Sequence, residues 1–125
     1  MKIDQVFVYG TLKAGNSIRG MDRLGADFVA EATTTEAWFD MVDFGPFPAV
    51  VPDGESYIAG EVWQVDNEIM EILDQIEGYP HFYKRQIIET TAGPAWMYYL
   101  TDGFDTDDVW LEPDSRNVIT WNDKP

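Results

Sequence analysis

Glu77 is the side chain whose type and position best suit acid–base chemistry. The segment before it carries four apolar residues at helical spacing, Ile69, Ile72, Leu73 and Ile76. Because Glu77 follows Leu73 by four positions, its side chain is expected at the edge of this apolar stripe and not on the polar face. Burial and the negative end of the helix dipole would both raise the pKa of the carboxyl, as a general base near neutrality requires. The alternative is an exposed glutamate at a frayed helix end.

Other catalytic side chains are scarce. The sequence has no cysteine and one histidine, His81, which excludes thiolate nucleophiles, disulfides and the usual zinc sites. None of Ser17, Ser56 and Ser115 lies in a Gly-x-Ser-x-Gly elbow, so a Ser-His-Asp triad is not expected. The acidic residues 102–108 lack the spacing and closing glutamate of an EF-hand, and we expect a solvated loop there without a metal. A carboxylate is therefore the expected centre of any active site.

A second candidate is the loop that follows the first apolar segment, Tyr9-Gly10-Thr11-Leu12. Glycine at the end of a strand lets the backbone approach a ligand closely, and successive N–H groups in such a turn can hold a carboxylate or an oxyanion. The same pattern also occurs as a plain turn. We expect Lys13, which follows, to be a solubilising charge more than an anion anchor, and Arg85 to pair with a nearby carboxylate.

Composition and charge narrow the classes of partner. The chain has 125 residues, 45% of them hydrophobic, which suits one domain over residues 1–125. Eight Lys and Arg face 23 Asp and Glu, a formal net charge of −15, so free nucleic acid and anionic membrane surfaces are not expected partners. The sequence has neither a signal-peptide core nor an apolar run long enough to span a membrane. A cytoplasmic location is expected.

The elements that must position these residues can be read from pattern. Strands are expected at residues 2–9, once or twice within 26–42, and at 57–65, 82–90 and 95–100, and a loop is expected around residues 49–51 between two proline- and glycine-containing segments. A helix is predicted over 67–77, with Asp66 as its N-cap and Gly78 ending it, and its polar face includes Asp74. A short helix is expected near 18–24. Beyond residue 100 the chain is expected to be irregular, with Trp110 and Trp121 docked. Many short strands and one clear helix predict an α+β fold with a curved sheet or barrel.

These motifs resemble one known family. Tyr9-Gly10-Thr11-Leu12-Lys13 with Gly15 is similar to the opening block of the gamma-glutamylcyclotransferase-like (AIG2-like) family, which also includes gamma-glutamylamine cyclotransferases. The later block is Leu73-Asp74-x-x-Glu77-Gly78 followed by Tyr83-x-Arg85. Phe47-Pro48-Ala49, Gly60-Glu61-Val62-Trp63 and the strand containing Tyr98-Tyr99 lie in the family's order. The resemblance covers residues 5 to 100.

The resemblance implies a small mixed barrel with flanking helices and an intramolecular cyclisation. The α-amine of a gamma-glutamyl amine or peptide attacks its own side-chain carbonyl, which forms 5-oxoproline and expels the amine without a cofactor or a metal. Glu77 would carry the proton, the N–H groups of Gly10, Thr11 and Leu12 would hold the α-carboxylate or the oxyanion, and tyrosines would wall the pocket and offer hydroxyl hydrogen bonds. The tyrosines matched to this role are Tyr9, Tyr83 and Tyr98.

Two other functions are compatible with the sequence. A non-catalytic binding protein could retain the fold, and an acidic mimic of nucleic acid could block a basic partner. The motif around Glu77 and the intact loop at residues 9–12 favour the enzyme, because a mimic needs neither. The negative charge also predicts faster capture of amides whose leaving amine is neutral or cationic than of amides that end in a carboxylate. The oligomeric state and the identity of the amine stay open.

Overall fold

The computed structural model describes residues 3–13 and 20–122, which form short strands, one α-helix and one 3₁₀ helix. The strands are β1 (Gln5–Val8), β2 (Asp27–Thr33), β3 (Phe39–Asp43), β4 (Pro48–Pro52), β5 (Tyr57–Gln64), β6 (Lys84–Thr90), β7 (Gly93–Tyr99), β8 (Val109–Trp110) and β9 (Val118–Ile119). The helices are η1 (Met21–Leu24) and α1 (Asn67–Glu77). The expected short helix near residues 18–24 lies partly outside the described residues, and η1 occupies the described part.

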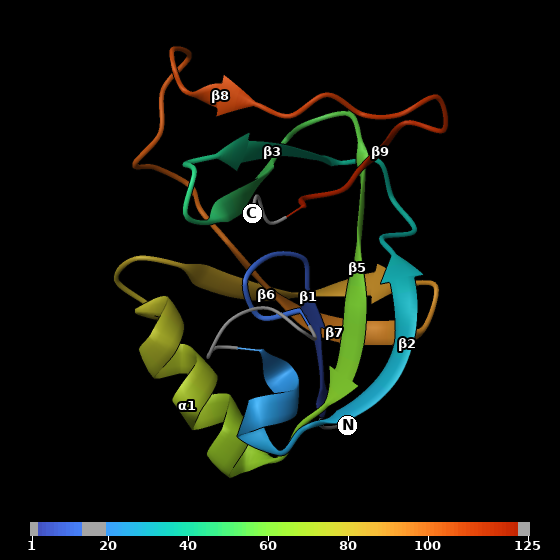
Figure 1. Cartoon of the computed structure of the whole chain (residues 1–125), viewed down its shortest axis with the longest axis vertical. Helices are drawn as coiled ribbons and strands as arrows, with labels where there is room; N and C mark the ends of the chain where they lie inside the picture. Colours follow the sequence, from blue (N-terminus) through green and yellow to red (C-terminus); the bar gives the residue numbers. More distant parts are fainter. Residues whose placement is uncertain (1–2, 14–19, 123–125) are drawn as a thin grey trace.

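The strands form two curved sheets that stay open, and the fold is α+β as predicted. The larger sheet has the order β2-β5-β1-β7-β6, with β9 added parallel to β5. The smaller sheet has the order β4-β3-β8. Figure 1 shows the smaller sheet at the end of the molecule opposite α1, which lies beside the larger sheet.

Strand β1 lies at the centre of the larger sheet and is buried on both faces. It pairs antiparallel with β5 and parallel with β7. Val6 and Val8 belong to the hydrophobic cluster that also contains Leu73 of α1 and Met21 of η1. Phe7 belongs, with Tyr9, to the cluster on the other face. Burial of both faces explains the continuous apolar run in the sequence of this strand.

Helix α1 begins and ends where the sequence predicts. The side chain of Asp66 accepts a hydrogen bond from the Ile69 N–H at 2.8 Å, and Gly78 ends the helix in the left-handed conformation with φ 66°. A left-handed residue at this position is commonly glycine because glycine lacks a Cβ. The N–H of Tyr79 then donates to the Asp74 carbonyl, which closes the turn. The helix end that carries Glu77 is therefore fixed by its own backbone.

Two details of the predicted elements are wrong. Residues 49–51 are not a loop but the middle of β4, which pairs along its whole length with β3 and has a proline at each end. Proline is tolerated there because it occupies the ends of an edge strand. Ile72 is not buried in the helix stripe but 41% exposed, and Leu73 alone of the helix residues is fully buried.

The segment after residue 100 is more ordered than expected. Besides β8 and β9, it contributes Trp121, which is 2% exposed and packs in the same cluster as Tyr9. The Trp121 backbone carbonyl accepts a hydrogen bond from Lys13 Nζ at 2.7 Å. The expectation that Lys13 is a solubilising charge is wrong, because its half-buried ammonium ties the loop after β1 to this segment. Burial lowers the pKa of Lys13, and the charges of Glu61 and Glu31 oppose that effect.

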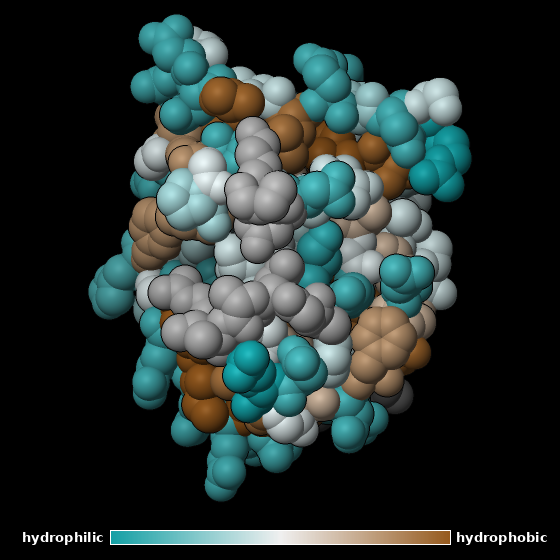
Figure 2. Space-filling model, viewed as in Figure 1, coloured by the Kyte–Doolittle hydropathy of each residue, from teal (hydrophilic) through white to brown (hydrophobic). Residues whose placement is uncertain are grey.

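The surface in the view of Figure 1 is mostly hydrophilic, with smaller hydrophobic areas between the polar side chains (Figure 2). Among the exposed large hydrophobic residues of the described chain are Phe28, Trp38 and Phe82. No helix in residues 3–13 and 20–122 is long and apolar enough to cross a membrane.

The burial of α1 predicts a sharp contrast between neighbouring residues. Leu73→Ala should lower the free energy of unfolding by about 2–5 kcal/mol, because it leaves a cavity under the helix. Ile72→Ala removes a similar side chain from a half-exposed position and should cost less than about 1 kcal/mol. Urea unfolding of both variants measures the difference. Equal losses would mean that the helix is not anchored through Leu73.

Candidate active site

A cavity of about 180 Å³ lies between the loop after β1 and the carboxyl end of α1. All seven residues that the sequence analysis assigned to a site line it: Tyr9, Gly10, Thr11, Leu12, Glu77, Tyr83 and Tyr98. They come from four places in the chain, the loop after β1, the last residue of α1, the turn before β6, and β7. The remaining lining residues are Phe7, Val8, Phe47, Pro48, Ile76 and Phe82.

The loop at residues 9–12 packs closely on the start of β4. A Cβ added at Gly10 would lie 2.8 Å from both Cγ and Cδ of Pro48. Glycine is therefore required at this position because a side chain would clash with Pro48. The sequence analysis expected the backbone to approach a ligand closely here, and the close contact in the structure is with Pro48. In the described part of the chain, the N–H groups of Thr11 and Leu12 donate to no protein acceptor, so they can serve a ligand.

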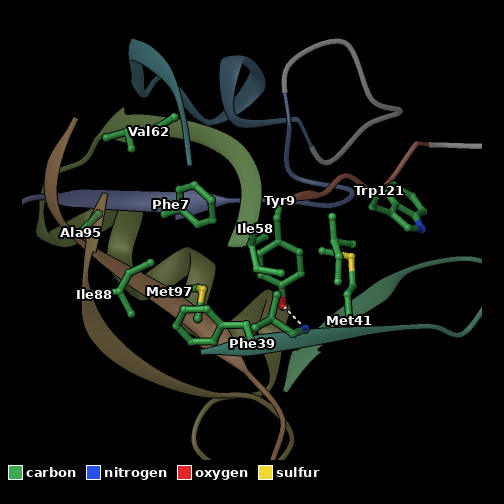
Figure 3. Close-up of a cluster of buried hydrophobic side chains, with 13 residues drawn as sticks. Phe7, Tyr9, Phe39, Met41, Ile58, Val62, Ile88, Ala95, Met97 and Trp121 are labelled. Atoms are coloured by element: carbon green, nitrogen blue, oxygen red, sulfur yellow. Dashed lines mark hydrogen bonds between the residues drawn. The ribbon is translucent and has the colours of Figure 1, made fainter. Parts of the chain in front are cut away.

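Tyr9 joins the loop to the interior. Its ring extends into the hydrophobic cluster beside Ile58 and Met41 (Figure 3). The hydroxyl donates to the Tyr98 carbonyl at 2.9 Å and accepts from the Val50 N–H at 3.0 Å, the second being the dashed line in Figure 3. The base of the cavity is thus held by bonds that join the loop after β1 to β4 and β7.

Glu77 and Tyr83 are brought together by the turn that ends α1. The N–H of Tyr83 donates to the Glu77 carbonyl at 3.2 Å, and the N–H of Phe82 donates to the Gly78 carbonyl at 2.7 Å. The Tyr83 hydroxyl then donates to the Pro48 carbonyl at 2.8 Å. Glu77 is half-buried at the cavity wall, so the expectation that it leaves the polar face of the helix is confirmed.

Asp74 is the residue of this region that the sequence analysis misplaced. It was expected on the solvated face of the helix, but it is half-buried and accepts a hydrogen bond from the Tyr98 hydroxyl at 2.7 Å. Arg85 lies on its other side, with Nε 3.0 Å from Asp74 Oδ1 in an ion pair and Nη2 donating to Oδ2 at 3.4 Å. The pairing of Arg85 with a local carboxylate is confirmed. Asp74 belongs to the sequence block that resembles the family. Arg85 in the same block was the signal that could have indicated a charged partner for Asp74.

Arg85 is further held between two aromatic rings. Its guanidinium carbon lies 4.6 Å from the ring centre of Tyr79 and 4.3 Å from that of Trp96. Such contacts favour a cation over the ring faces. Arg85 does not line the cavity, and its charge is engaged by Asp74 and these rings. It therefore stabilises the wall behind Tyr98 and does not serve as a ligand for an anion inside the cavity.

The three cavity tyrosines have raised pKa values. Burial is the main cause for Tyr9, Tyr83 and Tyr98, and the hydrogen bond to Asp74 adds to the pKa of Tyr98. The negative charge of Glu77 raises the pKa of all three. All three are therefore neutral phenols at physiological pH, and Glu77 is electrostatically coupled to each.

The hydroxyl protons of these tyrosines are already committed. Tyr9 donates to a carbonyl, Tyr83 to another carbonyl and Tyr98 to the Asp74 carboxylate. The prediction that they offer hydroxyl hydrogen bonds to a substrate therefore concerns their oxygens as acceptors, because a phenol that has donated its proton can only accept. The tyrosine oxygens are suited to a cationic group, such as an ammonium.

Among the described residues, no group of three or more His, Asp or Glu side chains is arranged so that it could hold a metal ion. In the acidic loop at residues 102–108, Asp108 Oδ2 accepts from the Asp105 N–H and Asp105 Oδ1 accepts from the Asp107 N–H. These carboxylates stabilise the turns of their own loop. His81 is exposed and does not line the cavity.

Similar sequences and structures are known. The family profile described as gamma-glutamyl cyclotransferase, AIG2-like, matches residues 6–117. The gamma-glutamylcyclotransferase family protein YtfP of Escherichia coli strain K12 is 36% identical over 98 residues, covering 75% of this chain and 80% of that protein. Gamma-glutamylaminecyclotransferase B of Danio rerio is 38% identical over 134 residues, covering 94% of this chain and 65% of that protein. The crystal structure of an AIG2-like protein from Mus musculus has the same fold, with a TM-score of 0.65 and 20% identity over 86% of this chain and 82% of that one.

The contact between Gly10 and Pro48 generates a prediction about stability. Gly10→Ala should lower the free energy of unfolding by about 1–3 kcal/mol, because the new methyl group forces Pro48 to move. Thr11→Ala, at the next position of the loop, is the matched control and should cost less than the Gly10 variant. Denaturant unfolding measures both. If Gly10→Ala is as stable as the native chain, the packing of the loop on β4 is looser than described.

The raised tyrosine pKa values predict the response to alkali. The chain has six tyrosines, and Tyr9, Tyr83 and Tyr98 should stay protonated well above pH 10 while the protein is folded. The unfolded chain ionises them near pH 10, so it binds fewer protons than the native state above that pH, and stability should fall as pH rises. Phenolate absorbance during an alkaline titration, with the denatured protein as control, measures this. Ionisation of more than three tyrosines before unfolding would contradict it.

Proposed function

The chain belongs to the gamma-glutamyl cyclotransferase, AIG2-like family, and on that premise we propose that it cyclises a small gamma-glutamyl amide to 5-oxoproline and releases the amine. The observation that carries the proposal is the convergence of Glu77 and the loop at residues 9–12 on one small cavity. The cavity holds a carboxylate, backbone N–H groups and a polar wall, which are the groups that this reaction needs.

The reaction requires no nucleophile from the protein. The lone pair of the substrate α-amine attacks the γ-carbonyl carbon and closes a five-membered lactam. The α-nitrogen loses two protons in all, one before the attack and one as it becomes the lactam N–H. The bond from the γ-carbon to the amide nitrogen then breaks, and the departing nitrogen takes up both protons and leaves as an ammonium. No water and no redox partner is consumed. The scarcity of nucleophilic side chains in this sequence fits that chemistry.

Glu77 is the proposed proton carrier. It accepts a proton from the α-ammonium, which exposes the attacking lone pair, and delivers that proton to the leaving nitrogen. The second proton, released when the α-nitrogen becomes the lactam nitrogen, takes the same route to the leaving nitrogen. Among the described residues that line the cavity, it is the only carboxylate. Its side chain sits at the carboxyl end of α1, where the helix dipole favours the protonated form that must exist between the two transfers.

The remaining groups bind and orient the substrate. In the proposed complex, the N–H groups of Thr11 and Leu12 donate to the α-carboxylate or to the oxyanion that forms at the γ-carbon. The oxygens of Tyr83 and Tyr98, whose protons are donated elsewhere, accept from the α-ammonium. Binding in this way folds the glutamyl chain so that its amine meets its own carbonyl, which supplies a large effective concentration.

The two alternative functions predict different dependence on Glu77. A binding protein on the same fold would take up 5-oxoproline or a gamma-glutamyl amide without converting it. An acidic mimic would depend on its negative charges collectively, so that any one glutamate could be replaced. The enzyme alone requires the carboxyl of Glu77 for turnover, whereas an exposed carboxylate on the same helix can be replaced.

Replacement of Glu77 by glutamine is therefore the direct test. Glu77→Gln keeps the size of the side chain and removes the base, so turnover of gamma-glutamyl amides should fall by about 10²–10⁴-fold while the fold is retained. Amine release and 5-oxoproline formation are measured together, since the proposed reaction yields them in equal amounts.

Glu71→Gln is the matched control for this variant. It removes the same charge from an exposed position of the same helix and should leave turnover unchanged. Circular dichroism establishes that both variants are folded. Equal turnover by the native chain and by Glu77→Gln, or no turnover of any gamma-glutamyl amide by the native chain, would overturn the proposed function.

A further inference from the structure

The loop after β1 contains a turn at residues 10–13 that is closed by a backbone hydrogen bond. The N–H of Lys13 donates to the Gly10 carbonyl at 3.1 Å. A trans peptide unit is planar, and its carbonyl and N–H point in opposite directions. The bond to the Gly10 carbonyl therefore sets the direction of the Thr11 N–H, which belongs to the same peptide unit. This N–H is one of the two groups that the proposed function assigns to the substrate.

The side chain of Lys13 ties this turn to a distant part of the chain. Its Nζ donates to the backbone carbonyl of Trp121 at 2.7 Å. The indole ring of Trp121 lies against the same turn, because a Cβ added at Gly10 would be 4.0 Å from its Cε3 atom. Figure 3 shows this ring in the buried cluster that also contains Tyr9. Trp121 therefore contacts the turn at both its first and its last residue.

Trp121 belongs to the segment 117–121, which is held on two strands. Strand β9 pairs parallel with β5. The Asn117 carbonyl accepts from the Tyr57 N–H at 2.9 Å, at the start of β5. The indole Nε1 of Trp121 donates to Oδ1 of Asp43 on β3 at 3.4 Å. The carbonyl that accepts from the lysine ammonium is therefore fixed relative to both sheets.

The ammonium of Lys13 acts through this bond and not on a ligand in the cavity. Lys13 does not line the cavity that contains Glu77, and it lines a separate hollow with Glu31 and Glu61. The side chain is half-buried, and a partly desolvated charge is unfavourable unless it is hydrogen-bonded. A hydrogen bond with a charged donor is stronger than one between neutral groups. The bond to Trp121 therefore favours one position of residue 13.

We propose that Lys13 is a positioning residue for the reaction: by its bond to the Trp121 carbonyl it keeps the turn at residues 10–13 closed, and thereby keeps the Thr11 N–H directed at the substrate. This inference rests on the proposed function. Without the bond, residue 13 can move away from the Gly10 carbonyl, and the peptide unit between Gly10 and Thr11 can rotate. A displaced donor no longer reaches the carboxylate or oxyanion that it should bind.

Replacement of Lys13 by methionine is the test. Lys13→Met keeps an unbranched side chain and removes the donor, so kcat/KM for gamma-glutamyl-ethylamide should fall by about 10- to 100-fold. Lys13→Arg keeps a cationic donor for the Trp121 carbonyl and should retain most of the native value. A rise in KM would assign the turn to the α-carboxylate, and a fall in kcat would assign it to the oxyanion. Circular dichroism gives the folded fraction, so that kcat is counted per folded molecule.

Two controls separate positioning from the loss of a positive charge. Arg116→Gln removes a positive charge from a side chain that is 79% exposed and lies next to the segment 117–121, and it should leave kcat/KM unchanged. The loss in Lys13→Met should also persist in about 1 M NaCl, where the Debye length is about 3 Å and the field of a distant charge is screened.

The outcomes distinguish the positioning role from the proposed function. If Lys13→Met does not fold, Lys13→Gln, which has a neutral amide on a shorter side chain, takes its place in the comparison with Lys13→Arg. Native kcat/KM in the variant, a loss that disappears in salt, or an equal loss in Arg116→Gln would overturn the role of Lys13 while the proposed function stands. Absence of any turnover by the native chain would overturn both.

Discussion

The attachment of the carboxyl end of α1 to the sheet depends on the Asp74 carboxylate. A half-buried carboxylate is stable only with partners, and Asp74 has Tyr98 on β7 and Arg85 on β6. Its own backbone carbonyl accepts the N–H that closes the turn after the helix. One residue thus fixes the helix end both to the sheet and to the turn that carries Phe82 and Tyr83.

From Asp74 a series of hydrogen bonds crosses the molecule beneath the cavity. Tyr98 donates to Asp74, its carbonyl accepts from Tyr9, and the Tyr9 hydroxyl accepts from the N–H of Val50. The second sheet is joined to the helix end a second time through the bond from Tyr83 to Pro48. Hydrogen bonds consequently tie the cavity wall to β4, to β7 and to the turn after α1, and such support suits a site that must hold a substrate in one reactive conformation.

The sequence predicted the local features well and the long-range partners poorly. The bounds of α1 followed from Asp66 and Gly78, because capping is a property of a few adjacent residues. The strand at residues 48–52 was missed because its proline ends suggest a loop, and only its pairing with β3 makes it a strand. Asp74 and Ile72 were placed on the wrong faces. Helical spacing gives the direction in which a side chain points around the helix axis, but it does not give how far around the helix the neighbouring elements cover it. Phe47 and Phe82 were not identified as lining the site, since nothing local separates them from other surface aromatics.

The chain is strongly acidic, yet the proposed substrates carry a carboxylate. The distribution of charge over the surface and the cavity resolves this apparent conflict. A net charge of −15 repels an anion approaching through solvent, but at physiological ionic strength each exposed charge acts over only about 8 Å. Inside the cavity the tyrosines are neutral, so among the described lining residues the charge that a substrate meets is that of Glu77. In the proposed reaction this carboxylate attracts the α-ammonium and receives its proton. For the proposed substrates, the field of the surface therefore acts on the approach of the substrate and the departure of the products, whereas the cavity acts on the glutamyl group that these substrates share.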